Sequence, residues 1–167
     1  MTSTKPQFSE YQYVIAGVSN LPNELYETFE KEGITRVTDD AYNLLSVATA
    51  ALVTSGTATL ETALFEVPQV VCYKTGTLSY LIAKNLIRVP YISLVNLVAE
   101  KEAVKELIQN DLTAPNLTEE LRAVLPNGTR REAQLQDYRH VKALLGEKGA
   151  SEKTGKLMVK YLKEAQK

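Results

Sequence analysis

The sequence predicts an α/β protein built on a doubly wound parallel sheet. Short β-branched runs without polar alternation are separated by segments in which apolar residues recur at helical spacing. This alternation is typical of parallel strands that helices cover on both faces. The composition, with 44% hydrophobic and 23% charged residues in 167, fits one soluble globular domain with a sizeable core.

The first third of the chain alternates strand and helix. Each predicted strand is a short apolar run, and Gly33 is expected to end the first helix in a left-handed conformation. The predicted elements are a strand at 11–16 ending at Gly17, a helix of about ten residues carrying Leu21, Leu25 and Phe29, a strand at 34–38, a short helix through Val47, and a strand at 50–54.

The alternation continues and then gives way to helices. From residue 102 onward the pattern favours helix throughout, with Val104, Leu107 and Ile108 on one face. The predicted elements are a helix at 58–65, a strand at 69–73, a helix at 78–86, a strand at 91–94, helices at 117–125 and 130–145, a linker at 146–151, and an amphipathic, Lys-rich helix at 157–162. We therefore divide the chain into a domain at 1–145 and a linker with a C-terminal helix at 146–167.

Composition and single residues exclude several classes of protein. The formal net charge of −1 gives no long-range attraction for nucleic acid, so no nucleic-acid partner is expected. The N-terminus has no apolar signal segment and no run approaches the roughly 20 apolar residues that span a bilayer, so we expect a cytoplasmic chain or one that begins inside a larger one. Cys72 reads as a buried thiol in a strand, and the single histidine, His140, lies in a polar helix and reads as a surface residue. A Ser-His-Asp triad and a metal site are therefore not expected.

The main candidate site is the loop that follows the apolar strand at 50–54. Gly56 lets backbone approach a ligand closely, Ser55, Thr57 and Thr59 supply hydroxyls, and the N-H groups of the following helix turn favour a diphosphate. Glu61 lies about one turn further along and is able to accept hydrogen bonds from both hydroxyls of a ribose. In the alternative interpretation, Ser or Thr caps the helix and Glu61 complements the helix dipole. Spacing alone leaves both interpretations open.

Further candidates follow along the chain. Tyr73 is the last residue of the strand at 69–73, and Lys74 follows it. Parallel sheets bind ligands at this end of their strands. Asn96 follows the run at 91–94, and Glu106 and Gln109 lie on the helix expected from residue 102. Each also has a purely structural interpretation, as a solvated lysine, a turn residue, or the exposed face of an amphipathic helix.

Taken together, these residues resemble the C-terminal domain of lipid-A-disaccharide synthase, a GT-B glycosyltransferase family of Gram-negative bacteria. The matching stretches are VIAG at 14–17, SGTATLE at 55–61, PQVVCYK at 68–74, and YISLVNLVAEKEAVKELIQ at 91–109. The similarity runs from about Tyr11 to Leu125 and more loosely beyond. SGTATLE alone is shared with related GT-B enzymes, whereas its combination with SLVNL and KELIQ is highly specific.

The resemblance implies a transferase in lipid A biosynthesis, within the lipopolysaccharide pathway. The family transfers a diacylglucosaminyl group from a UDP-linked donor to a monosaccharide lipid acceptor, and no cofactor or metal is expected. The C-terminal domain of GT-B enzymes has a Rossmann-like fold and binds the nucleotide, so 1–145 would be a UDP-sugar-binding domain. The site residues implied are Ser55, Gly56 and Thr57 at the diphosphate with Thr59 nearby, Glu61 at the ribose, Asn96, Glu106 and Gln109 lining the donor cleft, and Tyr73 and Lys74 at its edge.

The chain departs from the family pattern in two respects. The family's C-terminal domain begins with a strand and a Gly-Ser-Arg turn, which nothing before Tyr11 matches. In a doubly wound sheet that strand would be central, so the sequence leaves open how the sheet closes. The acceptor site and the catalytic carboxylate belong to the family's N-terminal domain, which this sequence does not contain.

We therefore expect a truncated donor-binding domain that is inactive by itself, with catalytic residues elsewhere. For the full enzyme, peripheral association with the inner membrane and a homodimer are compatible with the resemblance. Two alternatives stay open at this point. The first is another UDP-dependent GT-B transferase or a sugar-nucleotide epimerase, and the second is a non-catalytic nucleotide-binding or interaction module.

Overall fold

The computed structural model describes residues 4–54, 56–76, 90–146 and 149–165 of the chain. The predicted helix at 78–86 and the candidate residue Ser55 lie outside the described residues. The elements are η1 (Lys5–Gln7), β1 (Val14–Gly17), α1 (Glu24–Lys31), β2 (Thr35–Thr38), α2 (Ala41–Val47), β3 (Ala51–Val53), α3 (Thr57–Leu64), β4 (Gln69–Tyr73), α5 (Leu94–Ala99), β5 (Lys105–Ile108), η2 (Gln109–Asp111), α6 (Ala114–Val124), α7 (Arg131–Leu145) and α8 (Ala150–Ala165).

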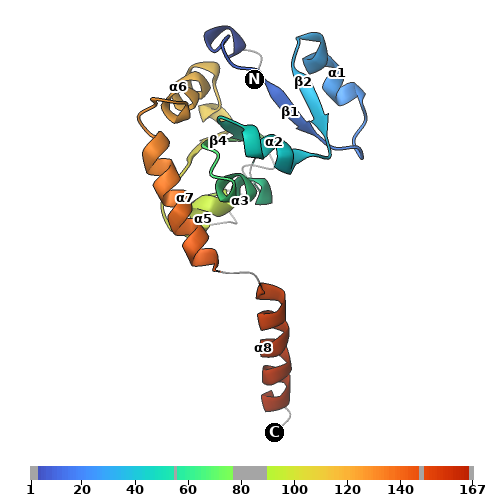
Figure 1. Cartoon of the computed structure of the whole chain (residues 1–167), viewed down its shortest axis with the longest axis vertical. Coiled ribbons are helices and arrows are strands. Elements are labelled where there is room, and N and C mark those ends of the chain that lie inside the picture. The colour runs from blue at the N-terminus through green and yellow to red at the C-terminus, as the bar shows by residue number, and fades with distance from the viewer. Residues whose placement is uncertain (1–3, 55, 77–89, 147–148, 166–167) are drawn as a thin grey trace.

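The described strands are parallel, and they form two separate sheets. β1 pairs with β2, and a second sheet has the order β3-β4-β5 (Figure 1). The predicted α/β class is therefore confirmed. Strands predicted in the first half of the chain are present within a few residues of their expected bounds, and Gly33 has the predicted left-handed conformation, with φ of 73°.

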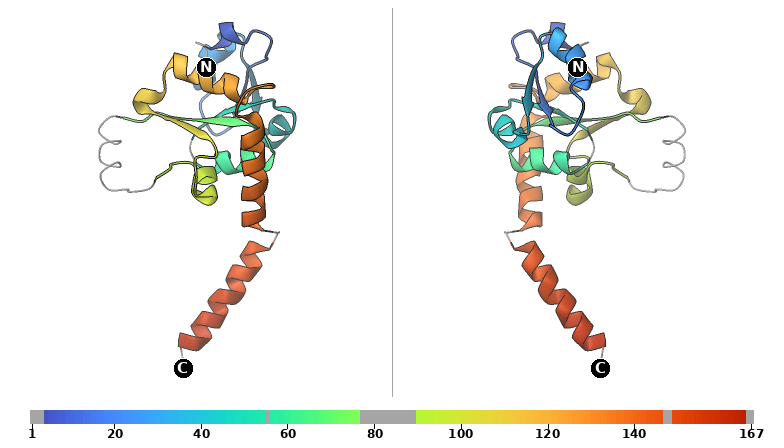
Figure 2. Two further views of the ribbon diagram at one scale, coloured as in Figure 1. Left: turned by 90° about the vertical axis from the view of Figure 1, so that its left-hand side faces the viewer. Right: turned by 90° about the vertical axis from the view of Figure 1, so that its right-hand side faces the viewer.

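The core lies on both faces of the three-stranded sheet. Val70 of β4 joins an apolar cluster with α6, whereas its neighbour Val71 joins a second cluster with α3, α5 and α7. Successive side chains of a strand point to opposite faces, so the two clusters cover opposite sides of the sheet (Figures 1 and 2). Because helices cover both faces of β4, the sequence of this strand is a nearly continuous apolar run.

Two predicted elements between residues 91 and 108 are wrong. The run at 91–94 is no strand, because Ser93 begins the short helix α5 as its N-cap and accepts a hydrogen bond from the Asn96 N-H. The segment at 105–108 is no helix, because β5 pairs with β4 along its whole length. The spacing of Val104, Leu107 and Ile108 fits a helix, but it also fits a strand that follows a buried residue. Pairing with β4 shows that the segment is a strand.

The C-terminal helix is longer than predicted. α8 begins at Ala150, so the last two residues of the predicted linker are helical. Figures 1 and 2 show α8 extending away from the rest of the chain. Its apolar side chains are exposed, for example Leu162 at 63%. In the described ranges, no helix combines the length and the apolar character needed to cross a membrane.

Candidate functional site

The loop between β3 and α3 has the backbone geometry of an anion site. Gly56 is the N-cap of α3 with φ of 129° and ψ of −162°, a combination that essentially only glycine adopts. The N-H of Thr59 bonds to the Gly56 carbonyl at 3.2 Å, while the N-H groups of Thr57 and Ala58 have no acceptor among the described residues. Two N-H groups at the positive end of a helix, at the carboxyl end of β3, are thus unpaired as far as residues 4–54, 56–76, 90–146 and 149–165 are concerned.

Thr59 holds this loop from inside the protein. Its side chain is fully buried and its hydroxyl donates to the Gly56 carbonyl oxygen at 2.8 Å. The amide of Gln69, itself buried, donates to the Thr59 carbonyl at 2.9 Å. Thr59 therefore fixes the position of Gly56, whereas Thr57 is exposed at the first position of α3.

Glu61 lies one turn further along α3 and is half-buried. Its carboxylate forms no hydrogen bond or ion pair within the part of the chain that the structure describes. The acidic group next to the anion-type loop is thus available for a ligand.

The carboxyl ends of β3, β4 and β5 lie at the same edge of the sheet. Because β3, β4 and β5 are parallel, Tyr73, the last residue of β4, lies at the same edge as Gly56 and Gln109, which follow β3 and β5. Tyr73 is half-buried and Lys74 is exposed. The Gln109 amide clamps the segment that leaves β4: its Oε1 accepts the Thr75 N-H at 2.8 Å, and its Nε2 donates to the Thr75 carbonyl at 3.1 Å. Gln109 therefore positions the backbone beside Lys74.

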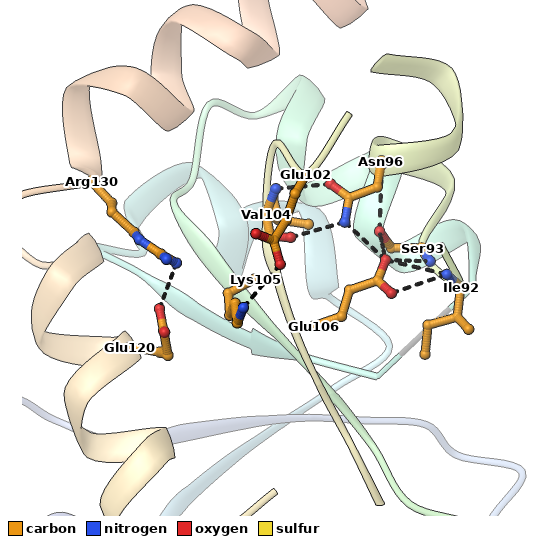
Figure 3. A network of polar contacts seen from close by, with 9 residues as sticks. All are labelled: Ile92, Ser93, Asn96, Glu102, Val104, Lys105, Glu106, Glu120 and Arg130. Atoms are coloured by element: carbon orange, nitrogen blue, oxygen red, sulfur yellow. Dashed lines mark hydrogen bonds and ion pairs between the residues drawn. The ribbon is translucent and has the colours of Figure 1, made fainter. Parts of the chain in front are cut away.

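Asn96 and Glu106 form a polar network at the N-terminus of α5 (Figure 3). The Glu106 carboxylate accepts hydrogen bonds from the Ile92 and Ser93 N-H groups at 3.0 and 2.9 Å, from the Ser93 hydroxyl at 2.7 Å, and from the Asn96 amide at 2.9 Å. Asn96 is fully buried, and its amide also exchanges two hydrogen bonds with the backbone of Val104, at 2.8 and 2.9 Å. The alternative interpretation of Glu106 as the exposed face of a helix is wrong, because β5 is a strand and directs this side chain toward α5.

Two residues of this region were missing from the sequence-based set. Ser93 caps α5 and contacts Glu106, and the backbone of Thr75 is the partner of Gln109. Ser93 was detectable, since a serine before a short apolar run is a common helix start. Thr75 was not, because the sequence gives no signal for a backbone partner 34 residues away.

The residues that lie outside this edge do not suggest another kind of site. Within the described ranges, no group of three or more His, Cys, Asp or Glu residues could hold a metal ion. Burial raises the pKa of the Cys72 thiol to about 11, which disfavours the reactive thiolate. His140 is exposed on α7, as predicted.

Comparisons with known proteins converge on one family. A family profile described as lipid-A-disaccharide synthetase matches residues 4–160. A lipid-A-disaccharide synthase of Syntrophus aciditrophicus is 37% identical over 153 residues, covering 87% of this chain and 40% of that protein. One of Geobacter sulfurreducens is 32% identical over 161 residues (95% and 42%), and one of Acidobacterium capsulatum is 40% identical over 115 residues (69% and 29%).

The chain thus spans less than half the length of these relatives. The matched region includes the loop before α3 and the strand ends described above, since it runs from residue 4 to residue 160. Both the profile and the relatives support the same assignment, and the chain belongs to the lipid-A-disaccharide synthetase family.

Proposed function

We propose that this chain is the donor-binding part of a lipid-A-disaccharide synthase, with the UDP group held at the loop before α3. The free N-H groups of Thr57 and Ala58, at the carboxyl end of a parallel strand, carry this proposal. In open parallel sheets ligands bind at this edge, and unpaired N-H groups at a helix start favour phosphate.

The diphosphate would contact the backbone at Gly56 and Thr57, together with the Thr57 hydroxyl. Apart from Gly56 and its two neighbours in the chain, no described atom lies within 4 Å of the position that a Cβ would occupy at Gly56, so the loop is open to a ligand on this side. Lys74 follows the next strand and is exposed, and its ammonium group would offset part of the phosphate charge. Ser55 precedes Gly56 within the loop, and we also assign it to the diphosphate.

The ribose would be recognised by Glu61. Its carboxylate is free of partners among the described residues and lies one turn from the phosphate-binding N-H groups. A carboxylate accepts two hydroxyl hydrogen bonds, which suits a ribose diol and repels phosphate. Other residues would shape the donor cleft indirectly. Asn96 and Glu106 hold α5, and Gln109 holds the backbone that follows β4. Tyr73 would lie at the edge of the cleft.

The reaction would be transfer of a diacylglucosaminyl group from UDP to a monosaccharide lipid acceptor. Transfer needs a base for the acceptor hydroxyl and stabilisation of the leaving diphosphate. The residues named above serve only the second task. We propose that the acceptor and the base belong to the part of the longer relatives that this chain does not cover.

The proposal is tested by titrating isotope-labelled chain with UDP and following backbone amide signals by NMR, a method that detects millimolar affinities. UDP is expected to shift the signals of Gly56, Thr57 and Ala58 and to bind more tightly than ADP. Glu61→Gln should weaken UDP binding roughly 10- to 150-fold, because hydrogen bonds to a charged group are worth about 1.5 to 3 kcal/mol.

Glu119→Gln, an exposed glutamate of α6, is the matched control and should leave UDP affinity unchanged. Shifts confined to other residues, or equal affinity for UDP and ADP, would contradict the proposed site. Unchanged UDP affinity in Glu61→Gln would instead support the view that this carboxylate complements the helix dipole.

Peripheral association with the cytoplasmic face of the inner membrane and a homodimer complete the proposal. The exposed apolar side chains of α8, including Met158 and Tyr161, support contact with a membrane or with a second copy. Vesicle co-sedimentation and analytical ultracentrifugation distinguish these two outcomes.

A further inference from the structure

Glycine by itself does not fix the backbone that the proposed diphosphate site needs. The N-H of Thr57 belongs to the same planar peptide group as the carbonyl of Gly56, and the two point in opposite directions. Rotation about the Cα-C bond of Gly56 therefore redirects the Thr57 N-H. Because glycine has no Cβ, it permits a wide range of such rotations. The observed conformation of Gly56, with φ of 129° and ψ of −162°, has to be held by other groups.

Thr59 holds this peptide group from its buried side. The Gly56 carbonyl oxygen accepts two hydrogen bonds from Thr59, one from the hydroxyl at 2.8 Å and one from the backbone N-H at 3.2 Å. Thr59 is fully buried, so its hydroxyl is shielded from water. With the oxygen held by two donors, the Thr57 N-H points away from Thr59, where no acceptor lies among the described residues.

Thr59 is itself anchored to the sheet. Its carbonyl accepts a hydrogen bond from the side-chain amide of Gln69 at 2.9 Å, and Gln69, the first residue of β4, is fully buried. The Gln69 backbone in turn exchanges two hydrogen bonds with the buried amide of Gln134 on α7, at 2.7 and 3.0 Å. The hydroxyl that holds the Gly56 carbonyl is therefore fixed relative to the core of the domain.

Thr62 makes the same kind of contact with a different consequence. Its hydroxyl donates to the Ala58 carbonyl at 2.7 Å, and the residue is buried, with 2% exposed. Such bonds from threonine to the preceding helix turn are common and need no ligand. The peptide group that Thr62 holds carries the Thr59 N-H, which already bonds to Gly56. Of these two contacts, it is that of Thr59 that fixes a peptide group whose N-H is unpaired among the described residues.

We propose that Thr59 is a positioning residue of the donor site, whose hydroxyl orients the Gly56–Thr57 peptide group so that the Thr57 N-H is aimed at a diphosphate oxygen. A hydrogen bond to a carbonyl also polarises its peptide group, which makes the Thr57 N-H a stronger donor. The N-H is oriented before the ligand arrives, so binding requires less ordering of the loop. The identity of the ligand rests on the proposed function, whereas the hold on the peptide group does not.

Thr59→Val removes the hydroxyl and nearly preserves the shape of the side chain, and Thr62→Val is the matched control. Both variants lose one buried hydrogen bond to a carbonyl, so their melting temperatures should fall by similar amounts. UDP affinity, measured by NMR titration of the folded chains, should fall about three- to tenfold in Thr59→Val and stay unchanged in Thr62→Val. Thr59→Ser restores the hydroxyl and should bind UDP like the native chain.

Three results of the titration would overturn the inference. Native UDP affinity in Thr59→Val would show that the hydroxyl does not orient the donor. An equal loss of affinity in Thr62→Val would show that the variants merely loosen α3. A Thr59→Ser variant that binds as weakly as Thr59→Val would show that the methyl group, and hence packing, is what matters. Should Thr59→Val fail to fold, Thr59→Ala and Thr62→Ala replace the pair, because alanine is favoured in helices.

Backbone relaxation of the free chain, measured by NMR, separates this inference from the proposed ligand. The order parameter of the Thr57 N-H should be lower in Thr59→Val than in the native chain, because the peptide group gains freedom to rotate, and unchanged in Thr62→Val. If the native chain does not bind UDP, the proposed function is contradicted, and the Thr57 order parameter alone decides the role of Thr59. UDP binding with a native Thr57 order parameter in Thr59→Val would leave the donor site standing and refute that role.

Discussion

The carboxylate of Glu106 anchors the start of α5, so its replacement by glutamine should destabilise the fold. Glutamine keeps one acceptor oxygen for Ser93 and Asn96 but loses the negative charge. Its amide nitrogen would take the place of Oε2, which now accepts the Ile92 N-H at 3.0 Å. Two donors would then face each other, and the Ile92 N-H would lose its shorter bond while keeping the longer contact to Oε1, at 3.3 Å.

The expected loss of stability follows from this geometry. Hydrogen bonds to a charged group contribute about 1.5 to 3 kcal/mol and neutral ones about 0.5 to 1.5 kcal/mol, and four donors converge on Glu106. Because bonds within one network are not additive, we expect Glu106→Gln to cost about 2 to 4 kcal/mol. In a domain of this size that lowers the melting temperature by roughly 4 to 16 °C.

Glu102→Gln is the matched control, four residues earlier (Figure 3). Its carboxylate contacts Lys105 at 3.0 Å in an exposed pair, which is worth less than about 1 kcal/mol. Thermal unfolding followed by circular dichroism should therefore separate the two variants. UDP affinity should change little in Glu102→Gln. A melting temperature of Glu106→Gln equal to that of Glu102→Gln, together with a loss of UDP binding, would show that Glu106 serves the ligand and does not anchor α5.

Two further predictions concern Gly56 and Cys72. Gly56→Ala should cost about 1 to 3 kcal/mol from backbone strain alone, since φ of 129° suits only glycine and no atom crowds the added Cβ; Gly155→Ala, inside α8, should by contrast be neutral or stabilising in the same urea titration. The pKa of Cys72 is raised from its ordinary value of 9.0 to about 11 by burial, so its contribution to stability is complete below pH 9 and declines as the pH rises toward 11. Cys72→Ala should flatten this alkaline decline in unfolding measurements, and an unchanged pH profile would show that the thiol is not its source.

The candidate site was predictable where local sequence sets the geometry. Gly56 after an apolar strand and before a helix fixes a glycine-only turn and free N-H groups, and both follow from the chain within a few residues. The exposed position of His140 was read from its neighbours in the same way, whereas Cys72, expected to be buried, is half-buried. The ligand roles of Gly56 and its free N-H groups, and that of Glu61, are still predictions.

Partners distant in sequence were not predictable. Glu106 reads as an exposed helix position until β5 pairs with β4 and turns it toward Ser93, 13 residues earlier. Gln109 likewise reaches Thr75 across 34 residues. The four-residue β5 is too short for its own spacing to distinguish strand from helix.

The sequence by itself determined the alternation of strands and helices, the α/β class and the glycine turn at Gly56, because each depends on hydrophobic spacing or on backbone conformation over a few residues. The tertiary structure alone decided that Asn96 and Glu106 form an internal network and that β1 and β3, among the described strands, each pair on one edge only. Those outcomes depend on which strands pair and which backbone groups lack partners, and a linear pattern of residue types does not specify either.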